Sequence, residues 1–274
     1  MIQNRAGSTL TAAQRPLNRT QIKYIAIFLM LLDHAVSLPG TPYAIASSVH
    51  VFGRITAPVM AFFIAEGYRH TRDVRKYLLR LAVFALISAV PFRLFESHSV
   101  LPFEMLEGAA HPANSCTLYL EASGRTFVYY RGSVITTLFL GLLAIVLWDR
   151  AKLNVFVKLL LTALICRLAD LSDWSCWMVL YCLAFYFAGD DKVLKWTLFA
   201  AVSCMYAFNL KFSGFGFSLN PAFQTVRLGV FLAVPLLQCL YSGEPGAKTA
   251  VNRWFFYVFY PAHLLGLCLI RTLL

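Results

Sequence analysis

The stretch QIKYIAIFLMLLDHAVSLPG, residues 21–40, decides the class of fold, because it is apolar enough to lie in lipid and yet carries ionisable side chains. Lys23 stands near its start, and Asp33 and His34 stand side by side near its end. Ionisable side chains inside a membrane are costly, and they usually face a cavity or a partner helix. The stretch therefore predicts a first membrane span with a polar face.

The rest of the chain shares this apolar character. Of its 274 residues, 59% are hydrophobic and only 14% are charged, whereas a soluble domain carries about a quarter charged residues. Mean hydropathy is +0.66. The composition predicts an all-α fold, a polytopic bundle of membrane helices with about 20 residues in each span. We expect about nine spans, at residues 22–38, 51–69, 77–95, 133–149, 155–171, 174–189, 193–210, 226–241 and 254–272.

The organisation around these spans is simple. Residues 1–21 form a polar cytoplasmic tail without the apolar core of a cleavable signal peptide, and residues 22–274 form a single membrane domain. The ranges 155–171 and 174–189 are nearly continuous, so they are either a tight hairpin or one span with a re-entrant piece. The seven cysteines show no C-x-x-C spacing, so we expect neither a metal site nor a disulfide framework.

The formal net charge of +11 is explained by where the basic residues fall. With the N-terminus in the cytoplasm, sixteen of the 24 Lys and Arg residues lie in cytoplasmic segments, as the positive-inside rule requires. Nothing else in the sequence indicates nucleic acid, so we expect no such partner. The same orientation places the long connection 96–132 outside, where it covers a site, contacts a partner or is a solvated connector.

Helical geometry separates the three ionisable residues of the first span. Lys23 and His34 are eleven residues apart, which at about 100° per residue places both on one face, with roughly 16 Å of depth between them. Asp33 points about 100° away from His34. The spacing predicts Lys23 at the cytoplasmic edge and His34 past the midplane, on one polar face.

The second span and its continuation, VFGRITAPVMAFFIAEGYRHTRDVRKYLLRL from residue 51, run in the opposite direction. By depth, Arg54 can meet Asp33 or His34, and Glu66 can meet Lys23. These contacts are either membrane-buried ion pairs that fix packing or the walls of a polar channel.

Two further groups of ionisable residues stand out. His263 lies roughly 15 Å into the last span, just after Pro261, which can kink the helix; it either lines a cavity or bonds to a freed carbonyl. Arg167 and Asp170 are i, i+3 neighbours and are expected to pair.

A dense basic cluster follows the second span on the predicted cytoplasmic side. Positive-inside placement accounts for it, and a bound polyanion such as coenzyme A would also suit it. The cluster consists of Arg69, His70, Arg72, Arg75, Lys76 and Arg80.

Two classes of function fit these residues. One is a transporter whose buried charges relay protons, and the other is an enzyme with a histidine base inside the membrane. The sequence lacks matching halves with broken helices, which would favour a transporter.

Three segments resemble the TraX family, the F-pilin acetylases of conjugative plasmids, within the transmembrane acyltransferase superfamily. They are IKYIAIFLMLLDHA (22–35), GRITAPVMAFFIAEGYRHTRDVRKYLLRLAVFALISAVPF (53–92), and LYSGEPG (240–246) together with WFFYVFYPAHLL (254–265). Lys23 and His34 also have the spacing of the basic residue and histidine on the first span of that superfamily. The segment GSVITTLFLGL departs from the family pattern, because Ser133 stands where the family typically has Asn.

The resemblance implies a multi-pass enzyme of the bacterial inner membrane. It would transfer acetyl from acetyl-CoA to the N-terminal amine of a pilin subunit, directly or through an acetyl-His intermediate. His34 would be the general base, Arg54 would orient the site or stabilise the oxyanion, Asp33 would pair with Arg54, and His263 would be a second base or shape the site. The residues expected to bind acetyl-CoA are Lys23, Glu66, Arg69, Arg72, Arg75 and Lys76. A proton-coupled transporter and a non-catalytic pilus-assembly subunit are the alternatives.

Overall fold

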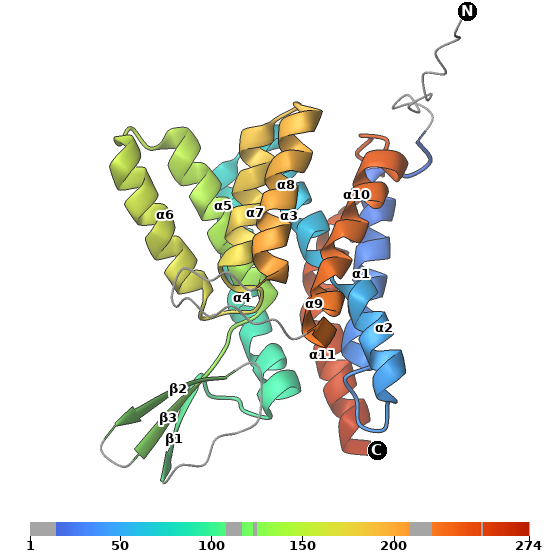
Figure 1. The fold of residues 1–274 in the computed structure, drawn as a ribbon, viewed down its shortest axis with the longest axis vertical. Coiled ribbons are helices and arrows are strands. Elements are labelled where there is room, and N and C mark those ends of the chain that lie inside the picture. Colours follow the sequence, from blue (N-terminus) through green and yellow to red (C-terminus); the bar gives the residue numbers. More distant parts are fainter. Residues whose placement is uncertain (1–14, 108–116, 123–124, 209–220, 248, 274) are drawn as a thin grey trace, which may run out of the picture.

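The computed structural model describes residues 15–107, 117–122, 125–208, 221–247 and 249–273, which form a helical bundle with a small sheet at one end (Figure 1). Each of the nine predicted ranges overlaps a helical segment. The principal helices are α1 (Arg19–Ala35), α2 (Tyr43–Gly53), α3 (Thr56–His70), α4 (Val74–Ser97), α5 (Val134–Arg150), α6 (Val155–Ala169), α7 (Ser175–Ala188), α8 (Lys192–Ala207), α9 (Pro221–Leu228), α10 (Ala233–Pro235) and α11 (Ala250–Leu273).

Three of the described helical stretches are long and apolar enough to cross a membrane, namely Tyr43–His70, Val74–Ser97 and Trp254–Leu273. The first of them joins α2 and α3 and begins well before the predicted residue 51. The number of crossings and the side on which the N-terminus lies stay predictions.

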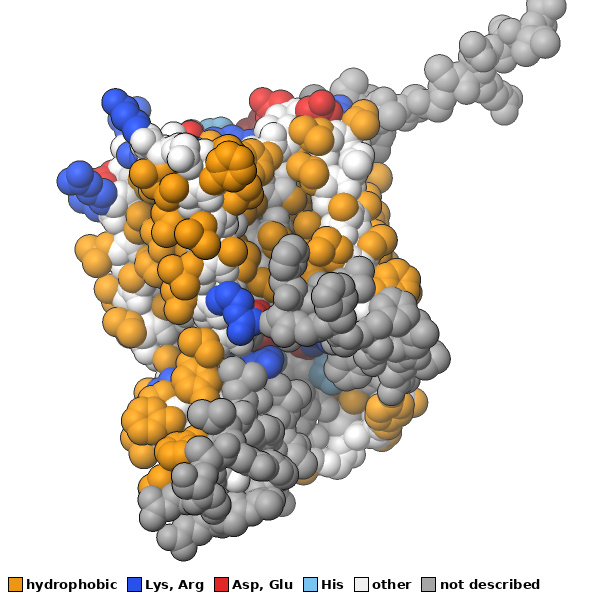
Figure 2. Space-filling model, turned by 60° about the vertical axis from the view of Figure 1, so that its left-hand side comes forward, with side chains coloured by type: hydrophobic (Ala, Val, Ile, Leu, Met, Phe, Trp, Pro, Cys, Tyr) orange, Lys and Arg blue, Asp and Glu red, His pale blue; other side chains and the backbone are white. Residues whose placement is uncertain are grey.

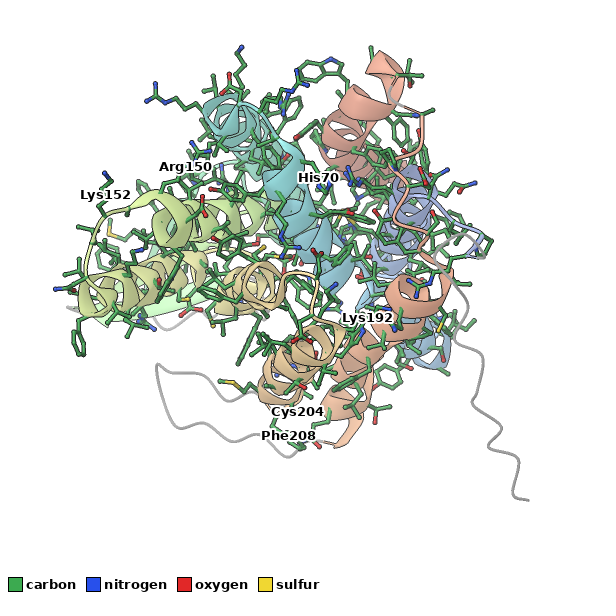
Figure 3. All side chains as sticks on the ribbon, turned by 90° about the horizontal axis from the view of Figure 1, so that it is seen from above. His70, Arg150, Lys152, Lys192, Cys204 and Phe208 are labelled. Carbon is green, nitrogen blue, oxygen red and sulfur yellow. The ribbon has the colours of Figure 1, made fainter. Side chains whose placement is uncertain are left out.

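The surface of the bundle suits a lipid environment. Hydrophobic side chains cover much of the flank seen in Figure 2, and on α6 the exposed fractions of Phe156 and Leu160 are 78% and 70%. Arg150, Lys152 and Lys192 lie around the end of the bundle at which α5 ends and α8 begins (Figures 1 and 3). This apolar flank with a basic end agrees with membrane embedding.

Helix α7 is the centre of one half of the bundle. Its sequence, SCWMVLYCLAFYFA, is apolar on every side, which is the pattern of a helix enclosed by others. It packs against α3, α5, α6 and α8, and Met178, Val179 and Tyr181 on it have no exposed surface. The ranges 155–171 and 174–189 are thus two helices, α6 and α7, that pack against each other.

The turn between α6 and α7 is held by Asp170. Its carboxylate pairs with Arg167 at 3.3 Å, as the sequence predicts. It also accepts hydrogen bonds from the Ser175 hydroxyl and the Cys176 amide, which satisfies the start of α7.

Helices α1, α2 and α11 and the irregular segment 221–240 form the other half. α1 contacts α2, α3 and α11, and α4 packs against both α5 and α11. The irregular segment contains a 3₁₀ turn, η2 (Gly229–Leu232), and a π turn, η3 (Leu236–Leu240). A Cβ atom on Gly229 would lie 2.0 Å from the carbonyl oxygen of Val51, so only glycine allows η2 to approach α2 this closely.

The prediction of an all-α chain is wrong in the connection 96–132. This segment contains a three-stranded antiparallel sheet of β1 (Phe103–Glu107), β2 (Thr117–Ala122) and β3 (Arg125–Tyr130), in the order β1–β3–β2. Strand β3 reads RTFVYY, rich in β-branched and aromatic residues. Its Thr126, Val128 and Tyr130 are buried, whereas Phe127 is exposed, which is the two-residue alternation of a strand.

Candidate active site

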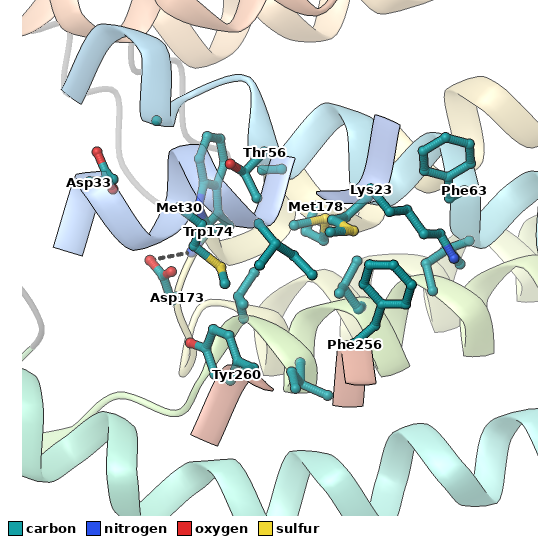
Figure 4. Close-up of a pocket in the computed structure, with 18 of the residues that line it drawn as sticks. Lys23, Met30, Asp33, Thr56, Phe63, Asp173, Trp174, Met178, Phe256 and Tyr260 are labelled. Carbon is teal, nitrogen blue, oxygen red and sulfur yellow. Dashed lines mark hydrogen bonds between the residues drawn. The ribbon is translucent and has the colours of Figure 1, made fainter. Parts of the chain in front are cut away.

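A cavity of about 1240 Å³ follows α1 along its whole length. Arg19, Lys23, His34 and Ser37 line it in turn, and at about 1.5 Å per residue they span roughly 27 Å. Figure 4 shows this cavity with Lys23 and Asp33 at opposite ends. We call these the Lys23 end and the His34 end. A cavity of this length approaches the thickness of a bilayer core, about 30 Å, and favours the polar channel over the alternative of ion pairs that only fix packing.

The Lys23 end is cationic. Arg19, Lys23 and Arg80 line it, and the Lys23 ammonium lies 5.4 and 5.3 Å from the ring centroids of Phe63 and Phe256. Such contacts stabilise a cation that has left bulk water.

Glu66 does not pair with Lys23, so that prediction is wrong. Its carboxylate accepts a hydrogen bond from Arg19 Nε at 2.9 Å and from the Tyr241 hydroxyl at 2.6 Å. The depth argument identified the correct level in the bundle, but Arg19 lies one helical turn before Lys23 and takes the carboxylate. Lys23 has no ion pair among the described residues, which leaves its charge available to the cavity.

The structure brings only one member of the predicted basic cluster into the described cavity wall, namely Arg80. Arg69 donates instead to the carbonyl oxygens of Phe185 and Tyr186 at 2.7 and 2.9 Å, and so caps the end of α7. Arg72, Arg75 and Lys76 are exposed beside the wall residue Thr71. Their role toward coenzyme A stays a prediction.

The two predicted histidines are bonded to each other. His34 Nδ1 lies 2.8 Å from His263 Nε2, and the rings stack with centroids 5.1 Å apart. His263 Nδ1 in turn lies 2.9 Å from the carbonyl oxygen of Phe259. His34 lines the cavity. His263 is not among the lining residues and is 8% exposed.

The predicted contact between Asp33 and Arg54 is confirmed at 3.3 Å. The sequence reasoning missed a third partner, His50, whose Nδ1 lies 2.8 Å from the other carboxylate oxygen of Asp33. His50 and Arg54 are i, i+4 neighbours, and they share the face of α2 that meets α1. That spacing could have identified His50, had the second span been started at Tyr43 instead of residue 51.

Gly53 sets the close approach that makes these contacts. A Cβ atom at this position would lie 2.1 Å from Asp33 Oδ1. The Asp33 carboxylate therefore occupies the space that a larger side chain at position 53 would fill. His50 and Arg54 each contact one of its two oxygens.

Mixed charges surround the rest of the His34 end. The Arg54 guanidinium lies 5.3 Å from the Trp174 ring centroid, and Asp173 in the α6–α7 turn accepts from the Trp174 amide at 2.8 Å. Burial raises the pKa of the Asp173 carboxyl. Arg227 lies 5.1 Å from the Tyr206 ring centroid. The two ends of the cavity thus differ, one cationic and one balanced in charge.

Comparisons with known proteins agree with the resemblance seen in the sequence. The family described as TraX protein matches residues 18–271. A curated protein of Dichelobacter nodosus, described as probable fimbrial assembly protein FimC, serogroup H1, is 30% identical over 253 residues, which cover 90% of this chain and 93% of that protein. No solved structure matches the chain.

Proposed function

The chain belongs to the TraX family, and on that premise we propose that it is a membrane-embedded acetyltransferase acting on a pilin subunit. The acetyl donor is acetyl-CoA, the acceptor is the N-terminal amine of the pilin, and the enzyme lies in the bacterial inner membrane. The observation that carries this proposal is that His34 lines a long cavity with one ring nitrogen tied to His263.

The hydrogen bonds of the two histidines define the role of each nitrogen. A carbonyl oxygen only accepts, so His263 Nδ1 donates to Phe259. With both rings neutral, His263 Nε2 is then an acceptor, and His34 Nδ1 donates to it. His34 Nε2 consequently carries the lone pair. That is the arrangement a general base requires, and such a base contributes about 10²–10⁴-fold to a rate.

The Lys23 end fits a donor that carries phosphates. Lys23 has no carboxylate partner among the described residues, and Arg80 Nε is buried without a hydrogen-bond partner there. Bound phosphate oxygens would satisfy both groups. Acetyl-CoA bound here supplies the activated acetyl group, and Lys23 and Arg80 hold its charged part.

The His34 end fits the acceptor. His34 Nε2 takes a proton from the amine nitrogen as that nitrogen bonds to the acetyl carbon, and returns it to the thiolate sulfur as the carbon–sulfur bond breaks. The imidazolium formed in between keeps its hydrogen bond to His263. Arg54 pairs with Asp33, the neighbour of His34 in the sequence, and its guanidinium orients the site or stabilises the oxyanion.

The test is the intact mass of the pilin. Coexpression with this protein should add the mass of one acetyl group at the pilin N-terminus, and His34→Ala should abolish the addition at unchanged membrane abundance. His70→Ala is the matched control, because His70 is exposed and bonds only to the Glu66 carbonyl among the described residues. An unmodified pilin in the presence of the wild-type protein would refute the proposal.

A non-catalytic assembly subunit is the second candidate, because the Dichelobacter relative is named a fimbrial assembly protein. Such a subunit would bind pilin and support pilus formation without His34. Pilus counts for the His34→Ala strain, measured beside the pilin mass, separate the two functions.

A further inference from the structure

An ammonium nitrogen loses two protons when it becomes an amide, and the proposed function assigns an acceptor to only one of them. An N-terminal amine has a pKa of about 7.7–8.0, so near neutral pH it arrives mostly as an ammonium ion. One proton moves through His34 to the sulfur of the leaving thiol. The other must leave before the nitrogen can attack, because an ammonium ion has no lone pair.

The His34 end holds a second histidine that can take this first proton. His50 lines the cavity, and its side chain is 28% exposed. Its Nδ1 lies 2.8 Å from Asp33 Oδ1. A carboxylate only accepts, so Nδ1 carries a hydrogen and Nε2 carries the lone pair. No hydrogen bond to Nε2 is found within the described residues.

The surroundings of His50 contain charged groups of both signs. Asp33 comes from α1 and is itself 14% exposed, and its second oxygen accepts from Arg54 Nη2 at 3.3 Å. The charged or titratable groups that line the same end come from several other elements: His34 on α1, Glu96 on α4, Arg131 after β3, Asp173 in the α6–α7 turn, Tyr206 on α8, Arg227 on α9 and Tyr260 on α11. Protonated His50 keeps its hydrogen bond to Asp33, a carboxylate that it shares with Arg54.

We propose that His50, held by Asp33, is the acceptor of the first proton of the ammonium substrate. The nitrogen–hydrogen bond of the ammonium ion breaks, its electron pair stays on nitrogen, and the proton bonds to His50 Nε2. The neutral amine then attacks while His34 takes the second proton. The proton on His50 passes to water at the His34 end, so that the sum is one amide, one thiol and one released proton. This assignment rests on the proposed function.

The assignment also predicts which amines are substrates. An N-terminal amine has a pKa about 2.5 units below that of a lysine side chain. The same acceptor therefore deprotonates an N-terminal ammonium ion far more readily than a lysine ammonium ion. We expect acetylation of the N-terminus and not of lysine.

The test compares His50→Gln with the wild-type protein across pH. Glutamine can still donate a hydrogen bond to Asp33 but takes no proton near neutrality. The assay uses the purified full chain in proteoliposomes, acetyl-CoA, and a synthetic peptide with the pilin N-terminus. The neutral fraction of the amine rises about sevenfold between pH 7 and pH 9, so the deficit of His50→Gln should shrink by about that factor over this range.

Two comparisons make the result decisive. His34→Gln should stay inactive at both pH values, because the proton that His34 accepts leaves the amine during the attack and not before it. A deficit of His50→Gln that is equal at pH 7 and pH 9, or no deficit, overturns the role of His50 while leaving the acetylase intact. Absence of acetylation by the wild-type protein would remove the proposed function and the role of His50 together.

Discussion

At the scale of the residue, the site depends on which nitrogen of each histidine is occupied. His34 and His50 both have Nδ1 engaged, by His263 and by Asp33 respectively, and both line the cavity. The partner of His34 is an imidazole and the partner of His50 is a carboxylate, so the two rings differ in the charge beside them. The proposed first acceptor is the imidazole that donates to a carboxylate, and the proposed base of the transfer step is the imidazole that donates to another imidazole.

His263 is a positioning residue in this scheme, and its variants should differ accordingly. His263→Gln keeps an oxygen that can accept from His34 Nδ1 and should retain most of the activity. His263→Phe keeps an aromatic ring without an acceptor and should lower kcat by about 10–10²-fold, with KM for acetyl-CoA unchanged. This loss is smaller than the factor of about 10²–10⁴ that a general base can contribute, because His34 itself remains. Peptide acetylation kinetics measure both.

A spectroscopic reading separates orientation from packing. In the wild-type protein, ¹⁵N shifts of labelled His34 should show hydrogen on Nδ1, and His263→Phe should show a mixture of the two neutral forms. Full kcat in His263→Phe, or an unchanged ¹⁵N spectrum, would contradict the positioning role.

At the scale of the element, hydrophobic runs predicted the helices. They predicted neither the structure of the connections between helices nor which helices contact each other. The strand pattern of RTFVYY was present in the sequence, yet it lay inside a stretch interpreted as a connector. His50 lies outside the predicted second span, which starts at residue 51, whereas α2 begins at Tyr43 and includes it. The contact between His34 and His263 joins residues 229 positions apart, and no local periodicity encodes it.

The approach of η2 to α2 is the tightest of these element contacts and can be tested by stability. Gly229→Ala places a Cβ atom against the backbone of Val51, which should destabilise the protein by about 1–3 kcal/mol, the usual cost of overpacking. Thermal unfolding in detergent should show a lower Tm.

Gly266→Ala is the matched control, since a Cβ atom on Gly266 meets nothing within 4 Å. Within a helix, alanine is favoured over glycine by up to about 1 kcal/mol, so this variant should keep or raise the Tm. Equal Tm values for the two variants would mean that η2 and α2 are not in close contact.

At the scale of the whole molecule, one cavity reaches from the Lys23 end to the His34 end. In the proposed reaction, a donor made in the cytoplasm and an acceptor presented outside would meet in it without either crossing the membrane. The predicted orientation places the Lys23 end inside, and the excess of basic residues supports that orientation.

Accessibility from the two sides tests this arrangement. In a cysteine-free background, Thr20→Cys at the Lys23 end should react with a charged, membrane-impermeant thiol reagent in inverted vesicles. Ser47→Cys at the His34 end should react in right-side-out vesicles. Labelling of both from the same side would contradict a cavity that joins the two faces.

The bond between His34 and His263 also sets a biosynthetic order. The proposed base stands on α1 and the residue that orients it stands on α11, 229 positions later. At about 5–20 residues per second, translation separates the two by roughly 10–50 s. Helix α11 also supplies Phe256 and Tyr260 to the cavity wall, so both the wall and the orientation of His34 are complete only after α11 has been inserted.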